Sequence, residues 1–236
     1  MLTALSTIDW FPIRLSFQVS TLATAIALVF GVSLAWVLAR RRFWGKEWLD
    51  AAITLPLVLP PTVLGYYLLV VLGQRSFLGR AHEWFWGSPL TFTPAAAVVA
   101  ATIHALPLMV KSVRATFESL DQRVEDAART LGASELRVFL TVTLPLARRS
   151  IEAATALAFA RALGDFGVTL MIAGNIPGKT QTASVAIYDA VQAGREQDAL
   201  VLVLIVSALA LAFLYTTNKL STTRVWSSEG RGMKDF

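Results

Sequence analysis

One stretch of the sequence has residue types that could bind a nucleotide. Residues 171–182 read MIAGNIPGKTQT, in which Gly174, Gly178, Lys179 and Thr180 are typical of a phosphate-binding loop. Such a loop needs four residues between its first glycine and the Gly-Lys-[Ser/Thr], so that backbone N–H groups surround the phosphates. Here three residues intervene, and Ala173 stands where that glycine should be. The spacing therefore argues against ATP binding by this chain.

Two ionisable residues in apolar surroundings form the other candidate site. Arg161 and Asp165 are four residues apart, which places them on one face of a helix, and charges inside a membrane usually face a protein interior and pair. We expect a structural ion pair that holds its helix in place. The alternative is that Arg161 offers positive potential to a passing dianion. His104 is expected to make an interhelical hydrogen bond, and no second metal ligand is predicted near it.

The composition indicates a membrane protein. Of the 236 residues, 55% are hydrophobic and 16% are charged, and the mean hydropathy is +0.58. A helix needs about 20 mainly apolar residues to cross the hydrocarbon core. The fold class is therefore expected to be all-α, a polytopic membrane protein. Five spans are predicted, at about 15–39, 51–73, 94–111, 153–173 and 199–218.

The basic residues predict the orientation. Most lysines and arginines fall in segments 40–46, 111–149 and 219–234, and cytoplasmic segments carry such an excess. We therefore expect the N-terminus outside and the C-terminus in the cytoplasm, with Lys179 on the outer face, away from cytoplasmic ATP. The net charge of +5 is explained by this topology, and no nucleic-acid-binding motif is present. The absence of cysteine excludes disulfides and thiolate metal sites.

One sizeable segment, at about 115–150, is predicted to be cytoplasmic. Asp121 is a plausible N-cap for a first short helix, Gly132 ends it, and a second helix begins near Ser134 and is broken by Pro145. Periodicity alone is equally consistent with a hairpin that lies against lipid headgroups. The first helix places four apolar residues on one face: Val124, Ala127, Ala128 and Leu131.

The residues of this hairpin carry a family resemblance. The stretch DAARTLGASELRVFLTVTLP resembles the signature of permease subunits in binding-protein-dependent ABC importers, with Asp in place of Glu and Val in place of Ile. The resemblance implies a coupling helix that docks on a separate ATPase subunit. The matching residues are Asp126, Ala127, Ala128, Gly132, Val142, Leu144 and Pro145.

The resemblance extends over most of the chain and suggests a substrate class. Residues 160–194 and 55–69 are similar to molybdate importer permeases, with sulfate permeases as the second candidate and tungstate not separable from molybdate. It implies one transmembrane permease domain over residues 1–236 in a bacterial or archaeal cytoplasmic (inner) membrane. It also implies a homodimer, two copies of an ABC ATPase that binds the ATP and Mg²⁺, and a periplasmic or extracellular molybdate-binding protein.

Two further hypotheses follow from the spans. Pro56, Pro60, Pro61 and Pro107 remove backbone hydrogen bonds within the bilayer, which indicates either a broken helix at the pathway or a kink buried in helix packing. Pro60, Pro61 and Thr62, together with Arg161 and Asp165, are candidate pathway or gate residues. No catalytic residue and no cofactor are predicted in this chain. A function of another class would be a membrane scaffold or signalling protein that does not transport.

Overall fold

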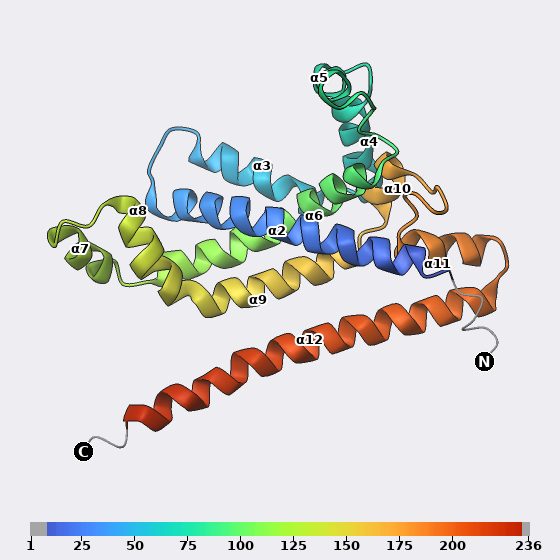
Figure 1. Cartoon of the computed structure of the whole chain (residues 1–236). Helices are drawn as coiled ribbons and strands as arrows, with labels where there is room; N and C mark the ends of the chain where they lie inside the picture. The colour runs from blue at the N-terminus through green and yellow to red at the C-terminus, as the bar shows by residue number, and fades with distance from the viewer. Residues whose placement is uncertain (1–8, 233–236) are drawn as a thin grey trace.

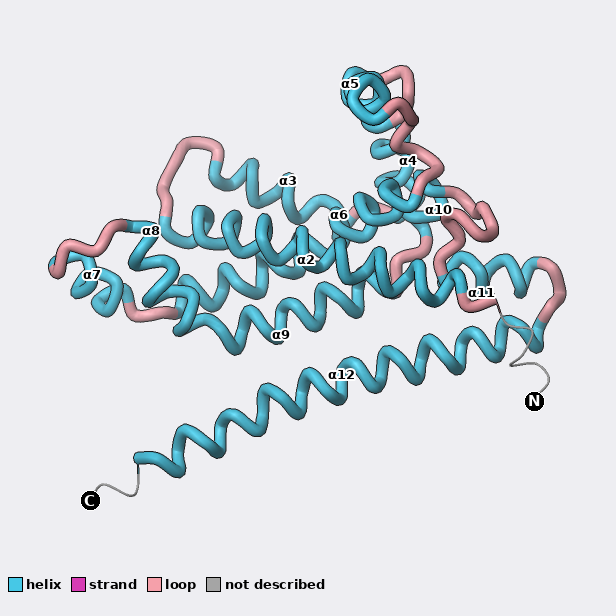
Figure 2. Tube along the Cα trace, viewed as in Figure 1, coloured by secondary structure: helices cyan, strands magenta, loops and turns pink. Residues whose placement is uncertain are grey.

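The fold is helical throughout the described residues. The computed structural model describes residues 9–232, and within that range the chain forms helices joined by short loops, with no β-strand (Figures 1 and 2). This confirms the all-α class. The helices are α2 (Phe11–Arg40), α3 (Lys46–Val58), α4 (Pro61–Leu72), α5 (Phe77–Trp86), α6 (Pro94–Ser119), α7 (Gln122–Thr130), α8 (Glu135–Val138), the π-helix η1 (Phe139–Thr143), α9 (Leu144–Leu163), α10 (Gly167–Ala173), α11 (Ala183–Gln192) and α12 (Glu196–Gly232).

The core of the bundle is the contact among α2, α6 and α9. Both α2 and α6 bury a stripe of small residues, including Ala23 and Ala27 on α2 and Ala97 and Ala101 on α6, all with no exposed surface. Small residues let helix backbones approach closely, which is the main way that helices gain packing energy in a membrane. Gly31 shows how close the approach is, because a Cβ there would lie 2.6 Å from the Cγ of Met109.

Two of the predicted spans are broken helices. The axes of α3 and α4 differ by 119°, and the change of direction falls at Leu59 and Pro60. Proline lacks an N–H and disfavours helical geometry in the residue before it, so the Pro60–Pro61 pair ends α3 and starts α4. The helix through α9 bends by 59° before α10. Pro107, in contrast, lies inside an unbroken α6, and Pro56 lies inside α3.

The two breaks meet. The segments α4 and α10 pack on one another beside the bundle (Figure 1). Gly65 of α4 lies against Met171, where a Cβ would come within 2.6 Å of the Met171 Cβ. Gly167, at the start of α10, lies equally close to Pro61.

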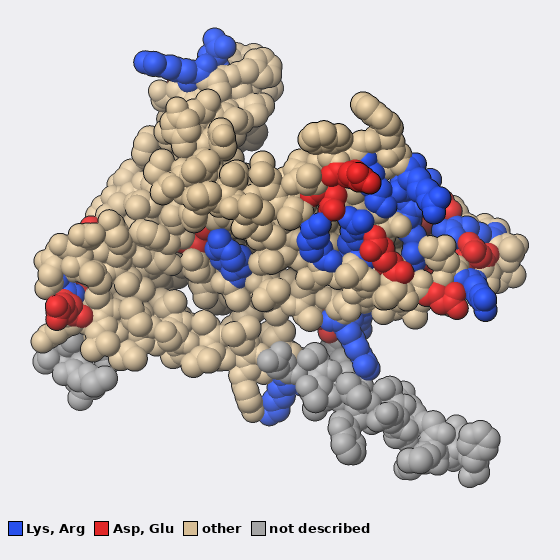
Figure 3. Space-filling model, turned by 180° about the vertical axis from the view of Figure 1, so that it is seen from behind, with Lys and Arg blue, Asp and Glu red and all other residues tan. Residues whose placement is uncertain are grey.

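The helices agree with a membrane-spanning chain. Three of them, Phe11–Arg40, Pro94–Ser119 and Glu196–Thr217, are long and apolar enough to cross a bilayer, and the number is five if each bent pair is one span. Charged side chains gather at the end of the molecule formed by the hairpin of α7 and α8, and the middle is largely free of them (Figure 3). The hairpin and the C-terminal end of α12 lie at the end opposite to α11 (Figure 1).

One sequence prediction about the hairpin is wrong. Pro145 does not break the second helix, because the chain stays helical from Glu135 to Leu163. The π-helix η1 precedes the proline, with the N–H of Leu144 donating to the carbonyl of Phe139. Pro145 then falls at the first turn of α9, where its missing N–H costs little.

The close contact at Gly167 can be tested by adding one methyl group. We expect Gly167→Ala to lower the Tm of the detergent-solubilised protein, because overpacking against Pro61 costs about 1–3 kcal/mol. The matched control is Gly164→Ala, whose new Cβ would have its nearest neighbour at 3.6 Å. Equal Tm values for the two variants would contradict this packing.

Candidate functional site

The hairpin at one end of the bundle is built by two capped helix starts and a glycine turn. The Asp121 carboxylate accepts a hydrogen bond from the N–H of Arg123 at the start of α7, and the Ser134 hydroxyl accepts one from the N–H of Arg137 at the start of α8. Between them, Gly132 has a φ of +83°, which glycine adopts at little cost. These three predicted roles are confirmed.

The apolar face of α7 points away from the protein. Val124 is 48% exposed and Leu131 is 88% exposed, and in α8 Leu136 is 66% exposed. Of the seven residues of the signature, Asp126, Ala127, Gly132 and Pro145 are exposed, and Ala128, Val142 and Leu144 are half-buried. Clustered apolar side chains that are left exposed mark an interaction surface.

A buried carboxylate connects this hairpin to the bundle. The Oε1 atom of Glu125 on α7 lies 2.8 Å from Nη2 of Arg40, at the end of α2, and accepts a hydrogen bond of 2.9 Å from the hydroxyl of Thr143 in η1. The Arg40 and Glu125 side chains are 7% and 2% exposed. One carboxylate thus joins α7, α2 and η1. No sequence motif marks this cluster, because its members lie far apart in the chain.

Arg129 holds the two arms of the hairpin together. Its guanidinium donates to Oε1 of Glu135 at 2.8 Å and to Oδ1 of Asp126 at 2.7 Å, and it lies 3.5 Å from Oε2 of Glu125. The hydrogen bond from Arg129 lowers the pKa of the Glu135 carboxyl, and the same bond raises the pKa of Arg129. Asp126, a signature residue, is therefore held in place from its own helix.

The intramembrane polar site has more members than predicted. Helix α9 ends at Leu163, so Arg161 and Asp165 do not share a helix face, and Nη1 of Arg161 lies 3.5 Å from Oδ1 of Asp165. The shortest contact of Asp165 with another span is to His104 of α6, with 2.6 Å between Oδ1 and Nδ1. The expected hydrogen bond of His104 between helices is confirmed, and so is the expected contact of Arg161 with Asp165, which belongs to a larger cluster with His104.

Asp165 also caps the second half of the broken span. Its Oδ2 accepts hydrogen bonds from the N–H of Thr169 at 3.2 Å and from the Thr169 hydroxyl at 2.6 Å. The first N–H groups of a helix have no partner within it, and inside a membrane such groups need one. The Gly164-Asp165 pair followed by Thr169 was the sequence signal for a helix stop and a new helix start.

The geometry indicates which partner the Nδ1 atom of His104 can donate a hydrogen bond to. Nδ1 is 2.6 Å from the Asp165 carboxylate and 2.8 Å from Nη2 of Arg161. A ring nitrogen that donates its hydrogen to Asp165 has no lone pair left to accept one from Arg161. With an ionised Asp165, Nδ1–H donates to the carboxylate, and Arg161 contributes as a nearby positive charge. Its side chain is 32% exposed, whereas that of Asp165 is 2% exposed.

The remaining candidates lie at the breaks and in the loop that resembles a P-loop. Pro60, Pro61 and Thr62 are exposed on the surface of this chain. Residues 174–182 connect α10 to α11 and follow a helix instead of a strand. The described residues contain no group of three or more His, Cys, Asp or Glu side chains arranged to hold a metal ion.

Comparison with known proteins decides the family. The model described as "Binding-protein-dependent transport system inner membrane component" matches residues 27–218. The chain belongs to this family. It is therefore a multi-pass membrane protein related to permease subunits.

Three relatives are similar in sequence to this chain over most of their length. The molybdenum transport system permease protein ModB of Escherichia coli (strain K12) is 47% identical over 87% of this chain and 90% of its own. A putative molybdenum transport system permease of Bacillus subtilis (strain 168) is 42% identical over 90% of this chain and 95% of its own. A probable sulfate transport system permease of Chlorella vulgaris is more distant, at 34% identity over 86% of this chain and 76% of its own.

A solved structure shares the fold of this family member. A bacterial alginate ABC transporter in complex with an alginate pentasaccharide-bound periplasmic protein matches with a TM-score of 0.76. It covers 93% of this chain and 81% of its own, at 14% identity. At that identity the likeness concerns the fold alone.

The Arg40–Glu125 contact gives a test of the joint between the hairpin and the bundle. We expect Glu125→Gln to lower the stability of the solubilised permease by about 3–5 kcal/mol, because it leaves the Arg40 charge buried without a counter-ion. The measurement is the Tm together with the folded yield. Glu47→Gln, at an exposed position in the first turn of α3, is the control and should change the Tm little. A Glu125→Gln protein as stable as the control would contradict the joint.

The intramembrane cluster predicts an order of stabilities. Asp165→Asn should lower the Tm more than Arg161→Gln, because Asp165 is buried and is the acceptor for both His104 and Thr169. The double change Arg161→Met/Asp165→Leu should not restore the Tm, since it leaves His104 and the Thr169 hydroxyl without an acceptor. Full recovery in the double variant would indicate an isolated pair of Arg161 with Asp165 instead.

Proposed function

We propose that this chain is the permease subunit of an ATP-driven importer that carries molybdate into the cytoplasm. The observation that carries the proposal is its 47% identity with the molybdenum permease of Escherichia coli over 87% of the chain. The relatives named for sulfate transport are more distant. Tungstate has the same tetrahedral geometry and charge as molybdate, so it is included in the proposed substrate class.

The proposal includes partners on both sides of the membrane. A separate ABC ATPase, present in two copies, binds ATP and Mg²⁺ and docks on the hairpin through the signature residues, while this chain has no enzymatic activity of its own. The exposed apolar side chains of Val124, Leu131 and Leu136 support such a docking surface. A binding protein delivers the anion from outside, and two copies of the permease enclose the pathway. The candidate residues along that pathway are Pro60, Pro61, Thr62, Arg161 and Asp165. The N-terminus lies outside and the C-terminus lies in the cytoplasm.

The function can be tested in cells that lack this chain. We expect molybdenum accumulation at limiting external molybdate to be lost and to return when the wild-type chain is supplied, with sulfate uptake unchanged. The measurement is the cellular molybdenum content by mass spectrometry, with labelled sulfate uptake in parallel. Loss of sulfate uptake alone would identify a sulfate importer. No change in either anion would indicate a scaffold that does not transport.

The docking surface can be tested by one substitution, with copurification of the ATPase and molybdate uptake as the measurements. Leu131→Asp should leave the permease inserted and folded but reduce the copurifying ATPase at least about tenfold, because an anchor residue in an interface contributes about 2 kcal/mol or more. Molybdate uptake should fall with it. The control is Phe43→Asp, an exposed apolar residue in the loop between α2 and α3 on the same side. Undiminished ATPase binding by Leu131→Asp would contradict the docking surface.

A further inference from the structure

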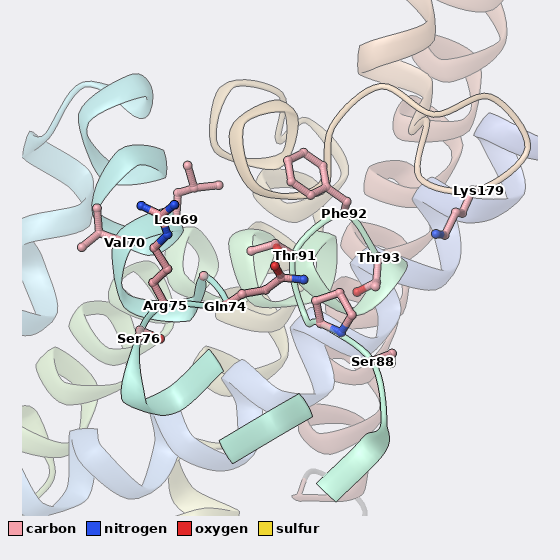
Figure 4. A pocket seen from close by; sticks show the side chains of 12 residues that line it. Leu69, Val70, Gln74, Arg75, Ser76, Ser88, Thr91, Phe92, Thr93 and Lys179 are labelled. Atoms are coloured by element: carbon pink, nitrogen blue, oxygen red, sulfur yellow. The ribbon is translucent and has the colours of Figure 1, made fainter. Parts of the chain in front are cut away.

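A large cavity opens at the end of the molecule away from the hairpin. Its volume is about 890 Å³, and roughly 10–15 Å³ measured in the same way is enough to hold one water molecule. It lies between the end of α4, the loop that follows α5, and the loop between α10 and α11 (Figure 4). Lys179, from the loop that resembles a P-loop, lines one side of it, and Arg75 lies on the other.

The charge of the lining is entirely positive. Among the residues that the structure describes, Arg75 and Lys179 are the only ionisable ones that line the cavity, and no carboxylate does. Within the described part of the chain neither cation has an ion-pair partner. A second cavity, of about 330 Å³, has the opposite character, with three aspartates and one arginine among its lining residues. The large cavity thus suits a dianion, and the smaller one does not.

Neutral hydrogen-bond donors also face this space. The Ser76 and Thr93 hydroxyls already serve the starts of α5 and α6. Gln74, Ser88 and Thr91 line the cavity too, and within the described residues their side chains have no hydrogen-bond partner. Amide and hydroxyl groups of this kind can donate to the oxygens of a tetrahedral anion.

The loops that carry these groups are fixed to the bundle. The N–H of Phe92 donates to the carbonyl of Ile172 in α10 at 2.9 Å, and Phe92 adopts a φ of +61°, which is rare for a residue with a side chain. A Cβ on Gly174 would lie 3.0 Å from Cδ1 of the Phe92 ring. The two loops are therefore packed against each other.

The turn that presents Lys179 is also well defined. The carbonyl of Ile176 accepts hydrogen bonds from the N–H groups of Lys179, Thr180 and Gln181, at 3.1, 2.9 and 3.2 Å. The Thr180 hydroxyl in turn accepts one from the N–H of Ile176. The turn closes on itself and leaves the Lys179 side chain exposed at the cavity.

We propose that this cavity is the outer receiving site for the transported tetrahedral dianion, with Lys179 and Arg75 as its cationic side chains. The proposal rests on the proposed function and adds a binding site to it. Because both cations are exposed, solvent and salt screen them, so the site attracts the anion without holding it tightly. A weak site suits an anion that must move on into the membrane.

The test uses the whole transporter in proteoliposomes, with the ATPase inside and loaded binding protein outside. Lys179→Gln and Arg75→Gln should lower the amount of molybdate carried per ATP hydrolysed about threefold or more at low ionic strength, even at saturating binding protein. The half-saturating concentration of binding protein should not change. Lys179→Arg should retain transport, and Arg80→Gln, a cation on α5 outside the cavity lining, is the matched control.

Two outcomes of this assay would overturn the proposal. If saturating binding protein restores transport and its half-saturating concentration rises, the two cations dock the binding protein instead of the anion. If both variants transport like the control, the cavity has no part in transport.

A second measurement does not depend on transport. In this chain without cysteine, Ser88→Cys introduces one thiol in the cavity lining. We expect an anionic thiosulfonate reagent to react faster than a cationic one, this preference to fall when Lys179→Gln is added, and molybdate to slow the anionic reagent more than chloride at equal ionic strength. Equal protection by the two anions would overturn the site even if molybdate is transported. Protection by molybdate in a transporter that imports none would uphold the site and contradict the proposed function.

Discussion

The close contact of α2 with α6 is the interaction on which the rest of this structure depends. Helices in a membrane gain little from hydrophobic burial against one another, because lipid tails are equally apolar, so their association relies on close packing. The alanines of both helices and Gly31 allow that approach. With α9 packed against the same pair, these three helices form the frame to which the broken spans, the hairpin and the loops at the opposite end are attached.

Breaking a helix inside a membrane exposes backbone groups that must find partners within the protein. At the break before α10, the Asp165 carboxylate supplies acceptors for the start of the new helix and is bound in turn by His104 of α6. At the break between α3 and α4, the prolines end one helix and begin the next, and the two half-helices α4 and α10 pack through Gly65 and Gly167. The break before α10 is therefore stabilised by hydrogen bonds to Asp165, and the break between α3 and α4 is stabilised by close helix packing.

The hairpin combines an exposed surface with a buried anchor. Its apolar side chains point away from the helix bundle, while Glu125 binds to Arg40 at the end of α2 and to Thr143 in η1. In the proposed transporter, a force applied to the outer face of α7 by an ATPase therefore reaches α2 through a buried, charge-assisted contact. Such a contact transmits displacement well, because separating it would leave the Arg40 charge buried without a counter-ion.

The sequence by itself determined the helical class, the apolar spans, the capped hairpin with its turn at Gly132, and the family. These features depend on composition, local spacing and a contiguous motif, which act over a few residues. The tertiary structure decided which distant side chains meet. Glu125 with Arg40, His104 with Asp165, and Lys179 with Arg75 at one cavity are each brought together by helix packing, and no local pattern marks them. It also decided that the helix continues through Pro145, because the preceding π-helix changes the hydrogen-bond register where the sequence alone indicated a stop.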